Sequence, residues 1–256
     1  MTNQFLRSKL IMSIIILAFI FTSCATKKDV VYFQNAKDFE TIVDTDTFTP
    51  KFKINDIVSI NISAYDVTAV KPFNLVAAGG GELGTAIDYL IDIEGNIDFP
   101  VLGKIKLLGL TVEEAKQLLK EKLSNGYLKD PVVNIRILNF RISILGAVGS
   151  PGVYTVSGER INILEAIANA GDLALKGRRD NILVIRDFNG TKTYTRIDIT
   201  NKEIFNSPVY YLTQNDVVYV EPNASAISGA GGDARIGQFL GYGSFLISII
   251  LLITRI

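Results

Sequence analysis

Alternation of apolar and polar residues predicts short β-strands along most of the chain. The stretches "KINDIVSINI" (residues 53–62) and "TQNDVVYVEP" (residues 213–222) share one design, in which Asn-Asp precedes apolar residues at every second position. Side chains of a strand point alternately to opposite faces, so this spacing buries one face and exposes the other. We therefore expect each stretch to be a turn that leads into a strand, and "DPVVNIRIL" (residues 130–138) to be a further strand.

Two segments have the apolar spacing of helices together with the residues that begin helices. Thr111 and Glu114 form a capping box, in which a hydroxyl and a carboxylate bind free N–H groups of the first turn. Asn162 and Glu165 repeat this pattern before a shorter helix, which we expect Gly171 to close. The longer helix has an apolar face made of Ala115, Leu118, Leu119 and Leu123.

Glycine, asparagine and proline mark the turns between these elements. Asn189-Gly190, between two alternating stretches, predicts a two-residue hairpin. Pro151-Gly152 has the residues that the central positions of a type II turn prefer. We expect Glu94-Gly95-Asn96 to be a turn between two short strands. The glycine-rich stretch at 77–85 lacks the Lys-Ser/Thr ending of a phosphate-binding loop and is interpreted as an ordinary loop.

Two acidic clusters suggest chemistry, but in both a structural role is favoured. The first alternates along the chain as calcium ligands do: Asp92, Glu94, Asn96 and Asp98. Its glycine comes too early for a calcium-binding loop, and Gly103 stands where such a loop needs glutamate, so we favour a β-turn. Glu113 and Glu114 lie at a helix N-terminus, where paired glutamates usually stabilise the helix dipole rather than act as catalytic acids.

Composition narrows the functions that are open to the chain. Its 26 basic and 26 acidic residues give no net charge, and no basic patch indicates nucleic-acid binding. The chain has no histidine and one cysteine, which excludes an internal disulfide, a histidine-activated nucleophile and a Cys/His metal site. We therefore expect no cofactor, no metal site, no catalytic residues and no enzyme activity. A pair of facing carboxylates of the glycosidase kind is the one enzymatic alternative that the sequence leaves open.

The N-terminus has the features of a signal peptide. Basic residues precede an apolar run from Leu10 to Phe21, which is too short to span a bilayer, and small residues then lead to Cys24. This order resembles a bacterial lipoprotein signal, which is cut before a cysteine that carries a diacylglycerol. Phe21 departs from the leucine that is usual at its position. We expect a signal peptide at 1–23 and lipidation of Cys24; the alternative is a secretory signal with an incidental cysteine.

The C-terminus predicts a second membrane attachment. Residues 223–235 are small and polar and indicate a flexible linker. Residues 236–256 are apolar, and a helix of about 21 residues covers about 30 Å, the thickness of a bilayer core. One side of this helix carries small residues at four-three spacing: Gly237, Gly241, Ser244 and Ser248. Such a stripe permits close helix packing in lipid or faces water. A plain anchor with incidental small residues fits the pattern equally well.

Between these ends the chain resembles the polysaccharide export outer-membrane lipoproteins of the Wza type. "IDIEGNIDFPVLGKIKLLGLTVEEAKQLLKEKL" followed by "DPVVNIRI" resembles the export domain of that family. "ISILGAVGSPGVYTV", "INILEAIANAGDL", "NILVIRD" and "QNDVVYV" resemble its soluble-ligand-binding β-grasp domain, SLBB. Two features depart from the family: a single β-grasp unit is present, and Asp172 follows Gly171 where a second glycine is usual.

Short strands around one short helix also suggest a β-grasp-like α+β unit without the resemblance. We expect an α+β fold in which a small export domain precedes the β-grasp domain and a C-terminal transmembrane helix follows. The predicted divisions of the mature chain are an N-terminal segment at 24–50, the export domain at 51–137, the β-grasp domain at 138–222, the linker and the terminal helix.

The resemblance implies a function for the two unusual ends. Family members assemble into homo-oligomeric rings whose C-terminal helices form an α-helical barrel in the outer membrane, while acyl chains hold the rim in the inner leaflet. The soluble domains enclose a periplasmic cavity that meets an inner-membrane polysaccharide copolymerase. Our leading hypothesis is therefore a channel subunit for capsular or exopolysaccharide. The alternative is a saccharide-binding or scaffold lipoprotein of the cell envelope that has no pore of its own.

Overall fold

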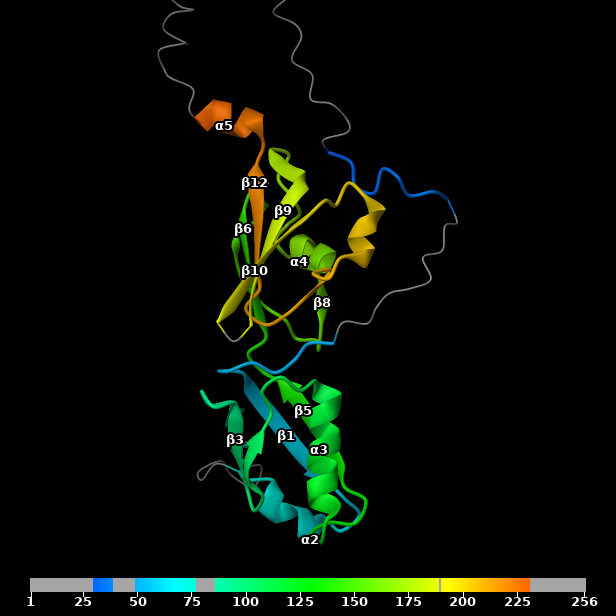
Figure 1. Ribbon diagram of the computed structural model, residues 1–256, viewed down its shortest axis with the longest axis vertical. Helices are drawn as coiled ribbons and strands as arrows, with labels where there is room; N and C mark the ends of the chain where they lie inside the picture. The colour runs from blue at the N-terminus through cyan, green and yellow to red at the C-terminus, as the bar shows by residue number, and fades with distance from the viewer. Residues whose placement is uncertain (1–29, 39–48, 77–85, 189, 231–256) are drawn as a thin grey trace, which may run out of the picture.

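The computed structural model describes residues 30–38, 49–76, 86–188 and 190–230. Within these residues the protein is a mixed α/β structure with few helices and several sheets. It forms two units that follow one another along the long axis (Figure 1). The first unit comprises residues 49–138 and the second residues 139–222. Each has its own cluster of buried apolar side chains.

The first unit is a small sheet covered by one long helix. Strand β1 (Ile57–Ser63) lies between β2 (Tyr89–Leu90) and β5 (Val132–Ile137), and both pairings are antiparallel. Helix α3 (Val112–Ser124) packs against β5. The unit is completed by the hairpin of β3 (Asn96–Phe99) and β4 (Gly103–Lys106), the short helix α2 (Val67–Val70) and the 3₁₀ turn η2 (Lys71–Phe73).

The second unit is built on a five-stranded sheet. Its strands are β6 (Arg141–Gly146), β7 (Gly152–Thr155), β9 (Gly177–Phe188), β10 (Thr191–Ile197) and β12 (Val217–Pro222). Their spatial order is β10-β9-β12-β6-β7, and only the pair of β12 and β6 is parallel. The first and last strands of the unit are therefore neighbours inside the sheet.

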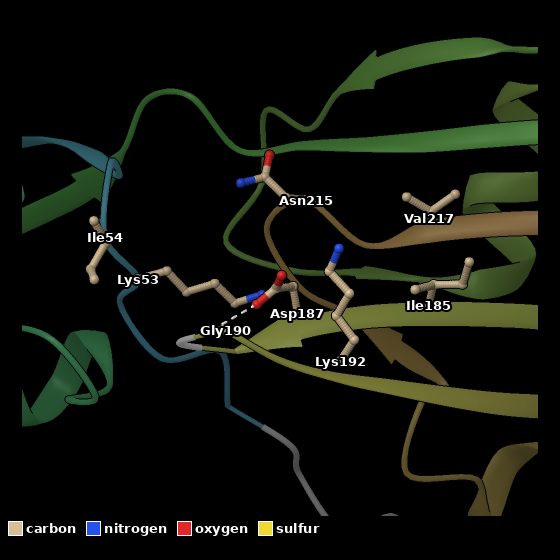
Figure 2. A pocket seen from close by; sticks show the side chains of 8 residues that line it. All are labelled: Lys53, Ile54, Ile185, Asp187, Gly190, Lys192, Asn215 and Val217. Atoms are coloured by element: carbon tan, nitrogen blue, oxygen red, sulfur yellow. Dashed lines mark hydrogen bonds between the residues drawn. The ribbon is translucent and has the colours of Figure 1, made fainter. Parts of the chain in front are cut away.

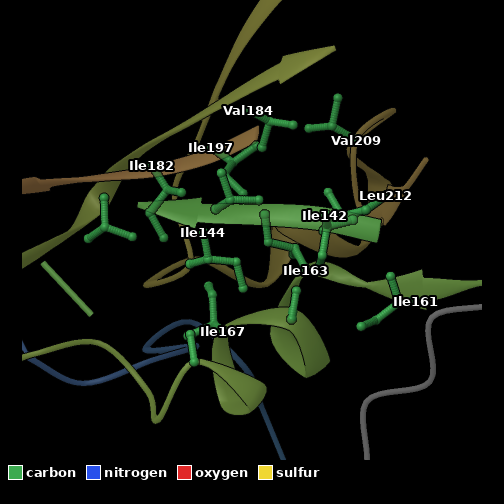
Figure 3. Packing of buried hydrophobic residues seen from close by; sticks show 14 of the residues in the cluster. Ile142, Ile144, Ile161, Ile163, Ile167, Ile182, Val184, Ile197, Val209 and Leu212 are labelled. Atoms are coloured by element: carbon green, nitrogen blue, oxygen red, sulfur yellow. The ribbon is translucent and has the colours of Figure 1, made fainter. Parts of the chain in front are cut away.

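One face of this sheet carries the core of the second unit. Helix α4 (Ile163–Asn169) covers it, together with the pair β8 (Ile161–Asn162) and β11 (Tyr211–Leu212) and the 3₁₀ helix η3 (Lys202–Asn206). Figure 3 shows Ile163 and Ile167 of the helix beside Ile142 and Ile144 of β6. All four side chains are at most 2 % exposed. Their burial supplies the hydrophobic free energy that holds helix and sheet together.

Local signals predicted several elements correctly. Both capping boxes are present: Thr111 and Glu114 exchange bonds of 3.2 and 2.7 Å, and Asn162 and Glu165 exchange two of 2.9 Å. The residue pairing Thr191↔Phe188 forms the predicted hairpin between β9 and β10. The alternation of β5 is as expected, with Ile135 fully buried between exposed polar neighbours.

One turn assignment was wrong. Pro151-Gly152 does not form the centre of a type II turn, because Gly152 lies outside the positive-φ region and already pairs with Ile144 as the first residue of β7. The residue with the left-handed backbone in this connection is Gly146, at φ 90°. The turn at Glu94-Gly95 lies between the short strands β2 and β3, as expected. These two strands have other partners, because β2 pairs with β1 and β3 forms a hairpin with β4.

The linker predicted at 223–235 also needs correction. Helix α5 (Ala224–Ala230) occupies most of its described part. Asn223 explains its start, because its side-chain oxygen accepts the N–H of Ala226 at 3.0 Å and its carbonyl accepts the N–H of Ile227 at 3.1 Å. The linker prediction was wrong here because a capping residue followed by small residues, including alanine, allows a short helix to form.

In the part of the chain that the structure describes, no helix is both long and apolar enough to cross a membrane. The transmembrane helix predicted at 236–256 lies outside the described residues, as do the signal peptide and the glycine-rich stretch at 77–85.

Candidate functional site

The residues predicted to act in function lie outside the described part of the chain. They are Cys24, the expected lipidation site, and the small-residue stripe of Gly237, Gly241, Ser244 and Ser248. The described residues instead form two polar constellations that join distant parts of the sequence. One lies between the two units, and the other fastens the N-terminal segment to the second unit.

The junction between the units is made by the two Asn-Asp turns. Asn55 and Asn215 both have left-handed backbones, with φ of 67° and 64°. In each turn the carboxylate of the following aspartate accepts the N–H of the residue three positions earlier, at 2.8 Å in both cases. Both aspartates, Asp56 and Asp216, are fully buried. The two stretches that have similar sequences therefore form turns of the same structure.

Lys53 connects one turn to the other. Its ammonium group donates to the Thr213 hydroxyl at 3.0 Å and to the Gln214 carbonyl at 2.7 Å. The side chain is only 8 % exposed. Burial lowers the pKa of Lys53, while the nearby charge of Asp216 acts in the opposite direction. A buried ammonium needs such partners, because a charge without them is costly to remove from water.

Asp216 is balanced by an arginine of the neighbouring strand. Arg186 on β9 donates through Nη2 to Oδ2 of Asp216 at 2.8 Å and through Nε to Oδ1 at 3.2 Å. The Thr213 hydroxyl donates to the same carboxylate at 2.8 Å. Lys53 of the first unit is therefore connected, through the Thr213 hydroxyl, to an ion pair of the second unit.

The segment between β5 and β6 is held by the same turns. The side chain of Asn139 accepts the N–H of Ile57 and donates to the Asn55 carbonyl, both at 2.9 Å. Gln214 donates to the Asn139 carbonyl at 2.6 Å and accepts the N–H of Arg141 at 2.7 Å. Because each turn binds the connection as well as its own unit, the two units are held in one orientation.

Asp56 is the incompletely hydrogen-bonded member of the junction. Its Oδ2 is satisfied by the N–H of Lys53, but its Oδ1 is buried with no hydrogen-bond partner among the described residues. Burial raises the pKa of Asp56 to about 6. The carboxyl group thus titrates at mildly acidic pH, well above its ordinary range.

A groove of about 500 Å³ opens beside Lys53 (Figure 2). Its apolar lining comes from Ile54, Ile185 and Val217, and its polar groups come from Lys53, Asp187, Lys192 and Asn215. Figure 2 shows Lys53 reaching toward Asp187 from the first unit, with Lys192 on the adjoining strand. A groove of this size and mixed lining has room for a ligand that carries both apolar and hydroxyl-bearing surfaces.

The second constellation fastens residues 30–38 to the second unit. The N–H of Phe33 donates to the Ile199 carbonyl at 3.2 Å, and the N–H of Gln34 donates to the Thr200 carbonyl at 2.7 Å. The Phe33 ring stacks on Phe205 with centroids 5.4 Å apart. We call residues 32–35 and their contacts the N-terminal clip.

Asp172 supplies the polar end of the N-terminal clip. Its carboxylate accepts the Tyr32 hydroxyl at 2.5 Å and the N–H of Leu173 at 2.7 Å, and its backbone is left-handed at φ 66°. Arg179 lies 5.8 Å from the centre of the Tyr32 ring. Burial, and then the bond to Asp172, raise the pKa of Tyr32 above its ordinary value. Asp172, which stands where a second glycine is usual, therefore makes a specific hydrogen bond to Tyr32.

The acidic clusters have the structural roles that the sequence indicated. Asp92 accepts the N–H of Asn96 at 2.8 Å, and Glu94 accepts a bond from the Asn96 amide at 3.3 Å. Glu114 is the capping residue of α3, and Glu113 pairs with Lys116 at 2.6 Å. No cluster of three or more metal-binding side chains occurs within the described ranges.

Sequence reasoning found the repeated turns but missed what they do. The likeness of the two Asn-Asp stretches was visible, whereas the contact between them was not. The N-terminal clip was missed altogether. Its only signal was the short apolar run from Val30 to Phe33, which has polar residues on both sides.

Comparison with known families agrees with this division of the chain. Residues 48–138 match the family model described as polysaccharide biosynthesis/export protein. Residues 141–220 match the SLBB domain. The two matches together cover about two thirds of the chain. A comparison with curated proteins finds no match.

Proposed function

Because the chain belongs to the polysaccharide export proteins of the Wza type, we propose that it is one subunit of an oligomeric outer-membrane channel for capsular or exopolysaccharide. A role in polysaccharide export or binding, with association to the cell envelope, follows from the two domains themselves. Neither matched family is a family of enzymes. The ring, the lipid anchor and the spanning helix are the proposed parts.

The observation that carries the proposal is where the two described chain ends lie. The N-terminal segment 30–38 and helix α5 both lie at the end of the second unit that points away from the first unit (Figure 1). Cys24 is six residues before Val30, and residue 236 is six residues after Ala230. An extended chain spans at most about 3.5 Å per residue, so both expected membrane attachments must begin within about 20 Å of this end.

This arrangement suits a protein that stands on one membrane. We assign the second unit to the side near the outer membrane and the first unit to the periplasmic side, where it would meet the inner-membrane copolymerase. Lipidation of Cys24 would hold each copy in the inner leaflet. One helix at 236–256 cannot enclose a polymer, whereas a ring of such helices can. The small-residue stripe would let neighbouring helices approach closely.

The second candidate is a saccharide-binding or scaffold lipoprotein with no pore. The observation that favours it is the groove beside Lys53, which is large enough for a small ligand. In that case the terminal helix would be only a second anchor. The exported polymer would then cross the membrane through another protein.

Truncation after Gly232 separates the two candidates. It retains helix α5 and both units and removes the segment 236–256. If that segment is part of the conduit, polysaccharide disappears from the cell surface and accumulates in the periplasm, although the lipoprotein is still acylated and folded. Unchanged surface polymer would refute the channel and favour the scaffold.

A matched control replaces residues 236–256 by an unrelated apolar helix of equal length without small residues. This variant restores membrane attachment but removes the stripe. The channel proposal expects export to stay defective in it, whereas an anchor role expects export to be restored.

A further inference from the structure

The central strands of the second unit are apolar on both faces. β9 contains the run Ile182 to Ile185, and β12 contains the run Val217 to Val220. Alternate residues of these runs lie in the core, including Val184 and Val218, both fully buried. The residues between them belong to neither core and are partly exposed. Strands with one solvent-facing side normally carry polar residues there, and uninterrupted apolar runs are typical of strands covered on both faces.

The strand register brings these outward residues together. Tyr219 pairs with Leu183 on one side and Leu145 on the other, and Val217 pairs with Ile185. The row continues through Ser143 to Val153 on the edge strand β7. We call this surface the open face: Leu145, Val153, Leu183, Ile185, Val217 and Tyr219.

Ile185 and Val217, at one end of the open face, also line the groove beside Lys53 and Ile54 of the first unit. No described helix or sheet covers the rest of the open face. Helix α4 and the N-terminal segment 30–38 lie on the opposite side of the sheet (Figure 1). Residues of both belong to or pack against the core of the second unit. Val153 is 65 % exposed and Leu145 is 44 % exposed. Contiguous apolar patches on a soluble surface mark sites of interaction. The patch is bordered by charged groups, among them Arg196, which pairs with Glu221 at 2.8 Å.

We propose that the open face is the surface through which one copy of the chain packs against the next copy in the ring. This inference rests on the proposed function. Both chain ends leave from one end of the molecule, so copies attached to one membrane stand side by side in the same orientation. The strands of the sheet run along the long axis, so the open face looks sideways toward a neighbour (Figure 1).

The chemistry of the patch favours a protein partner over a sugar. Five of its six side chains are valine, leucine or isoleucine, which offer no hydrogen bonds to hydroxyl groups. An apolar centre with a charged rim is the usual anatomy of a protein interface. The open face lies on four neighbouring strands at about 4.8 Å spacing and is therefore about 14 Å wide, so it can form the centre of a standard interface of about 800 Å² per partner. In a ring of more than two copies, it must contact a different surface of the neighbour.

The test places charges on the most exposed part of the open face. Leu145→Glu with Val153→Glu changes two outward side chains and leaves both cores intact. Leu175→Glu is the matched control, because Leu175 is 78 % exposed and lies outside the open face. The full-length proteins are extracted in mild detergent, their oligomers are separated on native gels, and their folding is followed by circular dichroism.

We expect the double variant to remain folded and to need about tenfold more protein for half-assembly, as the loss of one interface hot spot would cause. The control should assemble like the wild type. An intact oligomer in the double variant would overturn this inference and leave the channel proposal standing. A monomeric wild type would overturn both.

A photo-crosslinking amino acid in place of Tyr219 gives an independent readout if the double variant does not fold. In cells, the expected product is a dimer of this chain. A product with polysaccharide or with another protein, in place of that dimer, would overturn the inference.

Discussion

Lys53 and Thr213 are the first residues of two equivalent turns, and a 3.0 Å hydrogen bond from Nζ to Oγ1 joins them across 160 positions of sequence. The two turns therefore do more than start a strand in each unit. They bind one another and the connection between the units, so the orientation of the export domain relative to the SLBB domain depends on a few side chains.

Lys53→Met tests this dependence. Methionine fills similar volume but leaves the Thr213 hydroxyl and the Gln214 carbonyl without their donor. We expect the free energy of unfolding to fall by about 1–3 kcal/mol, the cost of removing one partner from buried hydrogen bonds to a charged group. Urea unfolding of the detergent-solubilised protein measures the effect. Lys192→Met, in an exposed lysine of the same groove, should cost almost nothing; equal losses in the two variants would contradict the role of Lys53.

Asp56 predicts a pH dependence of stability. Its pKa is about 6 in the folded protein and 3.8 as the ordinary value, so between these values the folded state binds more protons than the unfolded state. Asp56 therefore contributes most to the free energy of unfolding below about pH 4, and this contribution is lost as the pH rises to about 6. The loss is on the order of 2–3 kcal/mol at most.

Asp56→Asn should remove this part of the pH dependence, since the amide oxygen can still accept the N–H of Lys53 and no charge is buried. The midpoint temperature of thermal unfolding, measured at several pH values between 4 and 7, should vary less with pH in the Asp56→Asn variant than in the wild type. Asp130→Asn is the control, because Asp130 is exposed and has a left-handed backbone that asparagine tolerates. A profile of the Asp56 variant that follows the wild type would show that the buried carboxyl is not the cause.

The hydrogen bond between Asp172 and Tyr32 should stabilise the N-terminal clip on the second unit. Asp172→Gly keeps the left-handed backbone accessible but removes the acceptor of the Tyr32 hydroxyl. Loss of about 1 kcal/mol should make the amides of Phe33 and Gln34 exchange with solvent about fivefold faster. Hydrogen exchange followed by mass spectrometry measures this rate.

Tyr32→Phe is the matched variant, because it removes the other partner of the same bond. If the two changes act through one contact, the double variant should exchange no faster than either single variant. Additive effects would mean that Asp172 and Tyr32 stabilise the segment independently.

Cys24→Ala tests the proposed anchor. The alanine variant cannot be acylated, so we expect the precursor to accumulate and surface polysaccharide to be lost. Labelling with a radioactive fatty acid and staining of the surface polymer report the two effects separately. Normal surface polymer in a variant that takes up no label would show that lipidation is dispensable.

Local features were the predictable part of this fold. The capping boxes at Thr111 and Asn162 depend on residues within one turn of helix, and the Asn-Gly hairpin depends on two residues. The prediction of a type II turn at Pro151-Gly152 was wrong because strand pairing decides the geometry there. Gly152 is paired with Ile144, and the left-handed backbone is at Gly146, the last residue of β6.

The junction was not predictable, because a contact between Lys53 and Thr213 depends on how two separately folded units meet. The repeated Asn-Asp pattern showed that both sites would be turns, but no spacing in the sequence shows that two turns touch. Asp172 illustrates the same limit. Its departure from glycine was visible, while its partner Tyr32 lies 140 positions away.

The parallel pairing of β12 with β6 has a consequence for how the protein is made. β12 is the last strand of the second unit, yet it lies between β9 and β6. During synthesis or secretion, the first unit can close once β5 has emerged, whereas the second must wait for the last strand. Until then β6 and β9 present unpaired edges, which are prone to wrong pairing. The Lys53 side chain also lacks its partners in that interval, so arrival of residues 213–222 completes the sheet and the junction in one late step.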